Sequence, residues 1–182
     1  MALEAIGLTR EEMKLEDKIR DVPDFPKKGI VFKDITTLLK DAAAFKCVID
    51  ELATKYQGEQ VDMVVAMESR GFIFAAPLAY VLGTGFVPAR KGGKLPAETI
   101  KTRYSLEYGT ETVEIHKDAI MSGQRVLIVD DLLATGGTAA AMVELVEQLG
   151  GKVVGFAFLI ELTFLNGRQR LGERPVYSLI RC

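Results

Sequence analysis

Apolar residues along the chain fall into short continuous runs, and these runs predict strands that are buried on both faces. The clearest run covers residues 126–129, and two adjacent acids, Asp130 and Asp131, follow it directly. β-Branched runs of this length, closed by turn residues, are typical of strands inside a parallel sheet. Comparable runs predict further strands at residues 61–67, 85–89, 153–160 and 176–180.

Between these runs, apolar residues recur at helical spacing. Residues 142–149 supply an apolar stripe to a helix that begins near Ala139. Asp41 is the expected N-cap of another helix, whose apolar face contains Phe45, Val48, Ile49 and Leu52. The alternation of strands and helices predicts an α/β fold with a mostly parallel, doubly wound sheet.

The N-terminal part of the chain has a different pattern. A capping box that starts at Thr9 predicts a helix over residues 9–20. Residues 21–34 mix apolar side chains with prolines and Gly29, so this segment is expected to be extended, irregular and partly buried. Two explanations of its apolar character stay open. The loop packs on the core, or it forms one wall of a pocket for a flat aromatic ligand.

Alternating residues predict a β-hairpin in the middle of the chain, with strands at residues 105–108 and 112–116 and a turn at Gly109. In its second strand, Glu114 and His116 share the polar face. His116 has no neighbour in sequence that would orient it as a base, so it is expected to be a solvated strand residue without a catalytic role.

Composition narrows the class of protein. A chain of 182 residues is the size of one domain, and 23 basic against 25 acidic residues leave no global field to attract nucleic acid or a membrane surface. Two cysteines and one histidine exclude a disulfide framework and a multi-histidine metal site, so a reducing cytoplasm is expected. The uncharged stretch 72–89 contains prolines and glycines that divide it into a helix and a strand rather than a membrane span.

The residues that follow the run 126–129 have the chemistry of a phosphate-binding loop. Gly136 and Gly137 let the backbone approach an anion, Thr135 and Thr138 add hydroxyl groups, and the next helix presents unpaired N–H groups. The two acids would repel a phosphate, so they are expected to face a sugar diol, with or without Mg²⁺. The spacing matches neither the ATPase cradle nor the dinucleotide fingerprint. The alternative is a glycine-rich turn that binds no ligand.

A second charged turn, residues 68–71, lies between the strand 61–67 and a helix expected to end at Leu82. Open α/β folds bind ligands at the carboxyl ends of their strands, so this turn is expected to face the phosphate loop. After the strand 85–89, residues 90–94 are basic and glycine-rich, which predicts a mobile segment suited to face an anion.

Residues 129–138, Val-Asp-Asp-Leu-Leu-Ala-Thr-Gly-Gly-Thr, resemble the phosphoribosyl pyrophosphate signature of type I phosphoribosyltransferases. The Leu-Leu-Ala filling is similar to the adenine-specific branch of that family. The resemblance runs from Asp24 to Ile180. Within it, residues 24–35 are similar to the family's base-binding hood, and residues 68–72 to its pyrophosphate loop.

The resemblance implies one phosphoribosyltransferase domain over residues 1–182, with a hood at about residues 1–35 and a flexible flap at about residues 90–109. It also implies transfer of ribose 5-phosphate from phosphoribosyl pyrophosphate to N9 of adenine, with AMP and pyrophosphate as products. A homodimer is expected, with Mg²⁺ bound mainly through phosphoribosyl pyrophosphate and no direct protein ligand assigned to the metal.

The same resemblance assigns the site residues. The catalytic residues would be Glu107 and Arg90, and pyrophosphate would bind Glu68, Ser69, Arg70 and Lys91. Ribose 5-phosphate would bind Asp130, Asp131, Ala134, Thr135, Gly136, Gly137 and Thr138. The backbone of Val31 would select adenine, while Phe32 and Leu132 sandwich the purine.

Two alternatives stay open. An oxopurine-specific relative would use hypoxanthine or guanine in place of adenine. A non-catalytic regulator that senses phosphoribosyl pyrophosphate would need a DNA-binding module, and the sequence offers no region for one before Asp24 and no basic recognition face. The flap also has an alternative, a solvent-exposed hairpin in which Glu107 is an ordinary surface carboxylate.

Overall fold

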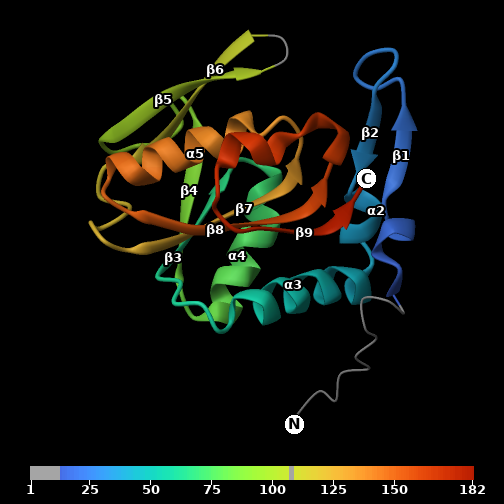
Figure 1. Cartoon of the computed structure of the whole chain (residues 1–182), viewed down its shortest axis with the longest axis horizontal. Helices are drawn as coiled ribbons and strands as arrows, with labels where there is room; N and C mark the ends of the chain where they lie inside the picture. The colour runs from blue at the N-terminus through green and yellow to red at the C-terminus, as the bar shows by residue number, and fades with distance from the viewer. Residues whose placement is uncertain (1–12, 107–108) are drawn as a thin grey trace. The chain divides into compact units, whose positions relative to one another are not determined.

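The computed structural model describes residues 13–106 and 109–182. The chain divides into two compact units, Met1–Leu52 and Ala53–Cys182, and helix α3 (Ala42–Tyr56) contains the boundary between them. Each unit has its own hydrogen-bonded sheet (Figure 1). The expectation of a single domain with a separate hood and flap stays a prediction.

In the smaller unit, strands β1 (Arg20–Pro23) and β2 (Val31–Asp34) form an antiparallel hairpin, drawn in blue in Figure 1. Gly29 has a φ angle of 89° in the turn, and its N–H donates a hydrogen bond to Asp24 Oδ1 at 2.7 Å. The extended backbone predicted for this segment is confirmed. Partial burial is also confirmed, since Val22, Ile30 and Phe32 are half-buried while Phe25 is 51% and Val31 49% exposed. The irregular backbone is wrong where β1 and β2 pair in register.

The helix predicted over residues 9–20 is wrong from Lys14 onward, whereas Met13 is helical. The chain forms one 3₁₀ turn, η1 (Leu15–Lys18), after Lys14 in the left-handed conformation, and Arg20 already belongs to β1. Leu15 is fully buried, but Ile19 is extended and only half-buried, so the apolar edge that the spacing predicted is not formed. Residues 9–12 lie outside the described part of the chain.

The predicted cap at Asp41 is confirmed. After the short helix α2 (Thr36–Leu39), Asp41 Oδ1 accepts hydrogen bonds from the N–H groups of Ala43 and Ala44, both at 3.1 Å, and helix α3 begins. Val48, Ile49 and Leu52 on this helix are buried as expected, which confirms its apolar face.

The larger unit contains a seven-stranded sheet in the order β5-β6-β4-β3-β7-β8-β9. Five strands are parallel, and β5 and β6 form an antiparallel hairpin at one edge. The strands are β3 (Met63–Met67), β4 (Gly85–Lys91), β5 (Thr99–Leu106), β6 (Gly109–His116), β7 (Arg125–Leu133), β8 (Lys152–Glu161) and β9 (Val176–Arg181). The predicted mostly parallel α/β sheet is confirmed.

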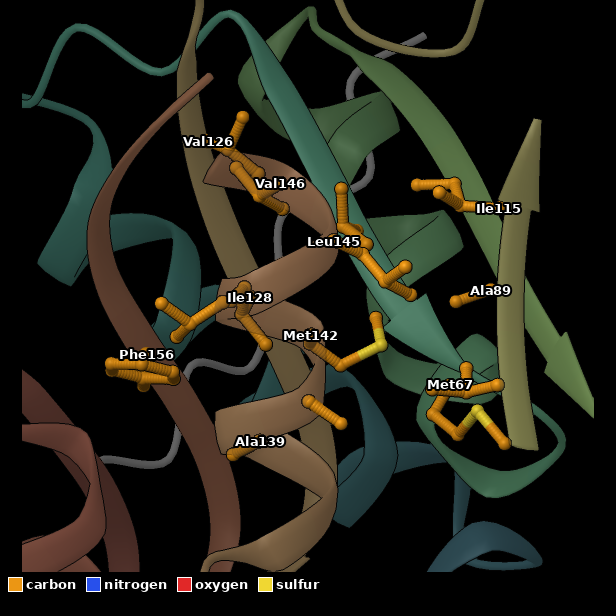
Figure 2. Packing of buried hydrophobic residues seen from close by; sticks show 14 of the residues in the cluster. Met67, Ala89, Ile115, Val126, Ile128, Ala139, Met142, Leu145, Val146 and Phe156 are labelled. Atoms are coloured by element: carbon orange, nitrogen blue, oxygen red, sulfur yellow. The ribbon is translucent and has the colours of Figure 1, made fainter. Parts of the chain in front are cut away.

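Helices α4 (Arg70–Leu82) and α5 (Gly137–Gln148) pack on opposite faces of this sheet. Side chains alternate along a strand, and Val65 and Met67 of β3 belong to the apolar cluster that contains α5 (Figure 2). Ala66, on the opposite face of β3, lies 3.3 Å from the position of a Cβ at Gly71 on α4. The sheet is therefore wound on both sides.

Several strands differ in length from the prediction. β7 continues through both acids to Leu133, because its pairing with β8 runs as far as Leu133 and Glu161. β4 includes Arg90 and Lys91, which pair with β6. The predicted hairpin is confirmed, but β5 begins at Thr99, and β6 already begins at Gly109, which pairs with Leu106 and is a strand residue rather than the turn.

The uncharged stretch between the second charged turn and the basic segment forms most of α4 and then β4, as predicted. Over residues 13–106 and 109–182, no helix combines the length and the apolar character that crossing a membrane requires.

Candidate active site

The two charged turns meet at the carboxyl edge of the parallel sheet. β3 and β7 are neighbours in register, with Ala66 opposite Val129, so the residues that follow each strand are adjacent. Arg70 at the start of α4 forms an ion pair with Asp131 on β7, with 3.1 Å between Nε and Oδ2. A Cβ at Gly71 would lie 2.8 Å from Asp130 Oδ1, so only glycine leaves room for that carboxylate. The predicted proximity of these turns is confirmed.

Asp130 and Asp131 form a tightly coupled acid pair at the end of β7. The N–H group of Asp131 donates to Asp130 Oδ1 at 2.9 Å, and the Asp131 side chain is only 5% exposed. Burial raises the pKa of both carboxyl groups, and the charge of Asp131 raises that of Asp130 further. Arg70 opposes the shift at each acid. A ligand that brings hydroxyl donors or positive charge would relieve this repulsion.

The phosphate loop, residues 134–138, covers the short connection between β7 and α5 and the first two residues of α5. Gly136 adopts a φ angle of 79°, which favours glycine, and α5 begins at Gly137 without an acidic residue in its first turn. The first N–H groups of a helix have no partner within the helix, and its dipole favours an anion there. This geometry is suited to a phosphate group bound through the backbone.

A second cluster of charges surrounds Glu68, directly after β3. Its carboxylate contacts Arg90 Nε at 3.0 Å and Lys94 Nζ at 2.8 Å, and accepts a hydrogen bond from the Lys91 N–H at 2.9 Å. Burial would raise the pKa of Glu68, but the hydrogen bonds from Lys94, Lys91 and Arg90 outweigh burial and lower the pKa to about 2. Glu68 therefore stays ionised and forms ion pairs with Arg90 and Lys94. The peptide bond between Glu68 and Ser69, the residue before α4, is cis.

The Lys91 side chain belongs to a network that reaches the phosphate loop. Lys91 Nζ lies 2.6 Å from Glu111 Oε1, and the Tyr104 hydroxyl donates to Glu111 Oε2 at 3.0 Å. Tyr104 also forms a hydrogen bond with Thr138, and burial followed by Glu111 raises the pKa of its hydroxyl to about 12. The β5–β6 hairpin is thus tied to both ends of the candidate site.

The backbone of the basic segment is more regular than its sequence predicted. Glu114 on β6 is 6% exposed, and its Oε1 accepts hydrogen bonds from Gly93 N–H at 2.8 Å and Lys94 N–H at 3.2 Å. A third N–H, from Leu95, lies at 3.4 Å. The irregular backbone expected for residues 90–94 is therefore wrong, because Arg90 and Lys91 pair in β4 and Glu114 binds the turn that follows. The expected mobility of this segment stays a prediction.

Sequence reasoning missed several residues of this site. The sequence places Glu114 on the polar face, includes Lys94 only as part of the basic segment, and gives Tyr104 and Glu111 no role. Alternation along a strand marks a residue as polar but not as buried, and the backbone groups that pair with Glu114 lie about twenty residues earlier in the chain. No pattern in the sequence identifies such a contact.

The remaining predicted site residues are placed as follows. Leu132 is half-buried in β7, while Val31 and Phe32 belong to the smaller unit, where the ring of Phe32 lies 5.2 Å from that of Phe25 in an edge arrangement. Their joint contact with a purine stays a prediction. Glu107 lies outside the described residues. His116 Nε2 faces the Ala97 N–H at 3.4 Å, and this weak hydrogen bond adds no catalytic partner.

Comparison with known proteins finds a matching family and similar proteins for this chain. The family model described as phosphoribosyl transferase domain matches residues 36–179. An adenine phosphoribosyltransferase of Chloroflexus aurantiacus is 61% identical over 174 residues, which are 96% of this chain and 99% of that protein.

Two solved structures are similar over most of their length. The crystal structure of adenine phosphoribosyltransferase from Thermoanaerobacter pseudethanolicus has a TM-score of 0.91 and 59% identity, over 93% of this chain and 99% of that one. The enzyme of the same name from Saccharomyces cerevisiae, complexed with adenine and an imino-altritol bisphosphate, has a TM-score of 0.86 and 44% identity, over 92% and 97% of the two chains.

Proposed function

The chain belongs to the phosphoribosyl transferase family, and from that premise we propose that it transfers the phosphoribosyl group of phosphoribosyl pyrophosphate to N9 of adenine. AMP and pyrophosphate are the products. The observation that carries this proposal is the arrangement at the end of β7, where an acid pair lies between a backbone anion cradle and a cluster of cations. The names of the relatives supply the base, adenine.

The ribose 5-phosphate half of the substrate fits the loop after β7. Asp130 and Asp131 accept hydrogen bonds from the two ribose hydroxyls, which relieves the repulsion that raises their pKa values. Residues 134–138 hold the 5-phosphate through backbone N–H groups and the hydroxyls of Thr135 and Thr138. The absence of acids from the first turn of α5 supports this arrangement.

The pyrophosphate half fits the cations of the neighbouring turns. Arg70, Arg90 and Lys91 are suited to contact its oxygens, and the Ser69 hydroxyl is suited to donate to one of them. Glu68 is an anion with a low pKa, so it contributes by holding Arg90 and Lys94 rather than by contacting pyrophosphate.

In the reaction, the bond between C1 of the ribose and pyrophosphate breaks and the bond from C1 to adenine N9 forms. Positive charge develops on the sugar as pyrophosphate leaves, so Arg90 and its neighbours act by neutralising the leaving group. Adenine loses the proton of N9, and Glu107, in the segment predicted to be the flap, is the proposed acceptor. Glu107→Gln should therefore lower kcat while leaving the affinity for phosphoribosyl pyrophosphate nearly unchanged.

Selection of adenine is proposed to occur in the smaller unit. The backbone carbonyl of Val31 would accept a hydrogen bond from the exocyclic amine of adenine and repel the oxygen that hypoxanthine carries at that position. The aromatic ring of Phe32 and the side chain of Leu132 would lie on the two faces of the purine. The 49% exposure of Val31 leaves this residue accessible to a ligand.

We propose Mg²⁺ as the cofactor, bound mainly through the oxygens of phosphoribosyl pyrophosphate. Residues 13–106 and 109–182 contain no group of three or more histidines, cysteines or acids placed to hold a metal ion. Asp130 and Asp131 would offer oxygen atoms of the kind that Mg²⁺ prefers. Bound there, the metal would neutralise charge on the leaving pyrophosphate.

A homodimer and a cytoplasmic location complete the proposal. Ile73, Tyr80 and Val81 on α4 are 37%, 87% and 53% exposed and lie at helical spacing, which gives this helix an exposed apolar face suited to a second copy. The proposed location rests on the scarcity of cysteine, two in 182 residues, which suits a reducing compartment.

A substrate panel tests the function directly. The purified protein, given phosphoribosyl pyrophosphate and Mg²⁺, should form AMP from adenine, with kcat/KM for hypoxanthine and guanine lower by about tenfold or more because a buried mismatch costs about 1–3 kcal/mol. Release of pyrophosphate provides the second measurement. Equal use of adenine and hypoxanthine would refute the proposed adenine contact, and no turnover of any purine would refute the transferase.

A further inference from the structure

A segment far along the chain lies directly on the phosphate loop. After β8 the chain forms two short 3₁₀ helices, η2 (Thr163–Leu165) and η3 (Gly167–Leu171), and Gly167, the first residue of η3, is buried. A Cβ at Gly167 would overlap the carbonyl oxygen of Ala134 and lie 3.1 Å from the Gly136 nitrogen. In return, a Cβ at Gly136 would overlap the carbonyl oxygen of Gly167. The two backbones are in contact with no side chain between them.

An ion pair holds Gly167 in this place. Arg168 donates two hydrogen bonds to the carboxylate of Glu161, one of them from Nη2 to Oε2 at 2.6 Å, and a third from Nη1 to the Val176 carbonyl at 3.0 Å. The Glu161 side chain is only 4% exposed, and the hydrogen bonds from Arg168 lower its pKa. The planar guanidinium of Arg168 is held by three oxygen atoms, two from Glu161 and one from Val176. The backbone of the adjacent Gly167 therefore has little freedom to move.

The ion pair is also connected to the strand that carries the loop. Glu161 is the last residue of β8 and pairs with Leu133, the last residue of β7, and the Leu162 N–H donates to the Leu133 carbonyl at 2.9 Å. The loop that starts at Ala134 is therefore fixed at its origin by β8 and along its length by Gly167.

We propose that Gly167, Arg168 and Glu161 form a buttress that sets the backbone of residues 134–136 and thereby the affinity for the 5-phosphate. This inference rests on the proposed function, because that function makes the loop the 5-phosphate site. A glycine-rich loop is flexible on its own, and a cradle of N–H groups binds an anion well only when its groups are held in advance. The three residues position the loop and do not contact the substrate.

Gly167→Ala tests the contact between the two backbones. The added methyl group must displace Ala134 or Gly136, so the dissociation constant for ribose 5-phosphate, measured by calorimetry, should rise by about tenfold or more. The dissociation constant for inorganic pyrophosphate and the KM for adenine should stay within about twofold. Gly58→Ala is the matched control, because a Cβ at Gly58 meets no atom within 4 Å.

Arg168→Lys tests the ion pair and keeps the positive charge. If Gly167→Ala does not fold, this variant alone tests whether the three residues set the affinity for the 5-phosphate. Lysine cannot make the paired hydrogen bonds to Glu161, and a rise of about fivefold in the dissociation constant for ribose 5-phosphate is expected. Arg174→Lys is its control, since Arg174 pairs with Glu147 at 2.6 Å. The inference is overturned if Arg168→Lys binds ribose 5-phosphate as tightly as the unaltered protein.

The two hypotheses fail in different ways. If the unaltered protein binds ribose 5-phosphate but forms no AMP, the transferase proposal falls, and the buttress still stands or falls on the two variants. If the unaltered protein does not bind ribose 5-phosphate, the buttress loses its ligand and is overturned as well. A loss of thermal stability without any change in ribose 5-phosphate affinity would assign the ion pair to folding alone and refute the inference.

Discussion

The phosphate loop and the basic segment lie at the ends of β7 and β4, the two strands on either side of β3, yet they are held by different interactions. Residues 134–136 are fixed by backbone contacts, a left-handed glycine and the close approach of Gly167. The basic segment is fixed by side chains, with Glu68 and Glu111 binding its cations and Glu114 binding its backbone. Backbone packing is insensitive to salt and intolerant of added atoms, whereas exposed ion pairs are screened by salt and tolerate similar replacements.

The difference assigns distinct tasks to the two regions. A loop held by packing presents a constant geometry to one anionic group, which suits the part of a substrate that does not react. A segment held by ion pairs can exchange its carboxylate partners for a polyanion and take them back when that polyanion leaves. The predictions below test this contrast from the largest expected effect to the smallest.

Gly136→Ala should have the largest effect. The new methyl group would overlap the Gly167 carbonyl, and a φ angle of 79° disfavours any residue with a Cβ, so kcat/KM for phosphoribosyl pyrophosphate should fall by about a hundredfold, or ~2.7 kcal/mol. Gly83→Ala is the control, since Gly83 has a φ of 69° but an empty space around it. If both variants keep kcat/KM within about threefold, the loop is not held by packing.

Replacing Asp130 and Asp131 together with asparagine should lower kcat/KM for phosphoribosyl pyrophosphate by about tenfold or more, ~1.4 kcal/mol per factor of ten. The amides keep the shape but remove the anionic acceptors for the ribose hydroxyls. Asp118→Asn, at an exposed position, should change nothing. Kinetics of the double variant that match the unaltered protein would show that the acid pair does not contact the sugar.

Glu68→Gln tests the side that depends on charge. The KM for phosphoribosyl pyrophosphate should rise by about fivefold, because Arg90 and Lys94 lose the anion that holds them. The difference in KM between the unaltered protein and Glu68→Gln should shrink at high salt, because salt screens the cations in both. An unchanged KM at low and high salt would contradict the proposed role.

The same variant carries a prediction about pH. The pKa of Glu68 falls to about 2 in the folded protein, below its ordinary value of 4.5, so its ion pairs stabilise the fold above pH 4.5 and are lost as the pH falls toward 2. The gap in melting temperature between the unaltered protein and Glu68→Gln should therefore be full at pH 6 and shrink at pH 3. A gap that is the same at both pH values would place the stabilisation elsewhere.

Glu114→Gln should have the smallest effect. The amide oxygen still accepts hydrogen bonds from Gly93 and Lys94, so the KM for phosphoribosyl pyrophosphate should rise by only about threefold. Glu98→Gln is the control on the adjacent segment, because Glu98 is 82% exposed and pairs only with Lys117 among the described residues. A Glu114→Gln effect as large as that of Gly136→Ala would show that the basic segment is as rigid as the loop.

The sequence predicted the larger unit well, because buried parallel strands and the helices that cover them leave strong periodic patterns. The strand ahead of the acids and the meeting of the two charged turns follow from those patterns, and in the smaller unit the cap at Asp41 does so as well. The extension of β7 through Asp131 does not, since it depends on pairing with β8, a strand about twenty residues further along.

The failures share one physical cause. The helix predicted at residues 9–20 and the irregular backbone predicted at residues 90–94 were inferred from local composition, and tertiary contacts decided both. Leu15 is buried within a single turn of η1, and Glu114 binds a turn that composition marks as flexible. The contact between Gly136 and Gly167 is equally invisible, because two glycines thirty-one positions apart carry no signal of their proximity.

The β5–β6 hairpin at the edge of the sheet affects how the protein behaves in concentrated solution. β5 is the outermost strand, and its free edge has backbone groups that an extended chain of another molecule would pair with. Lys101 and Arg103 are exposed along this strand. Charged side chains on an open edge discourage the growth of intermolecular sheets, so these two residues guard the molecule against aggregation without taking part in its chemistry.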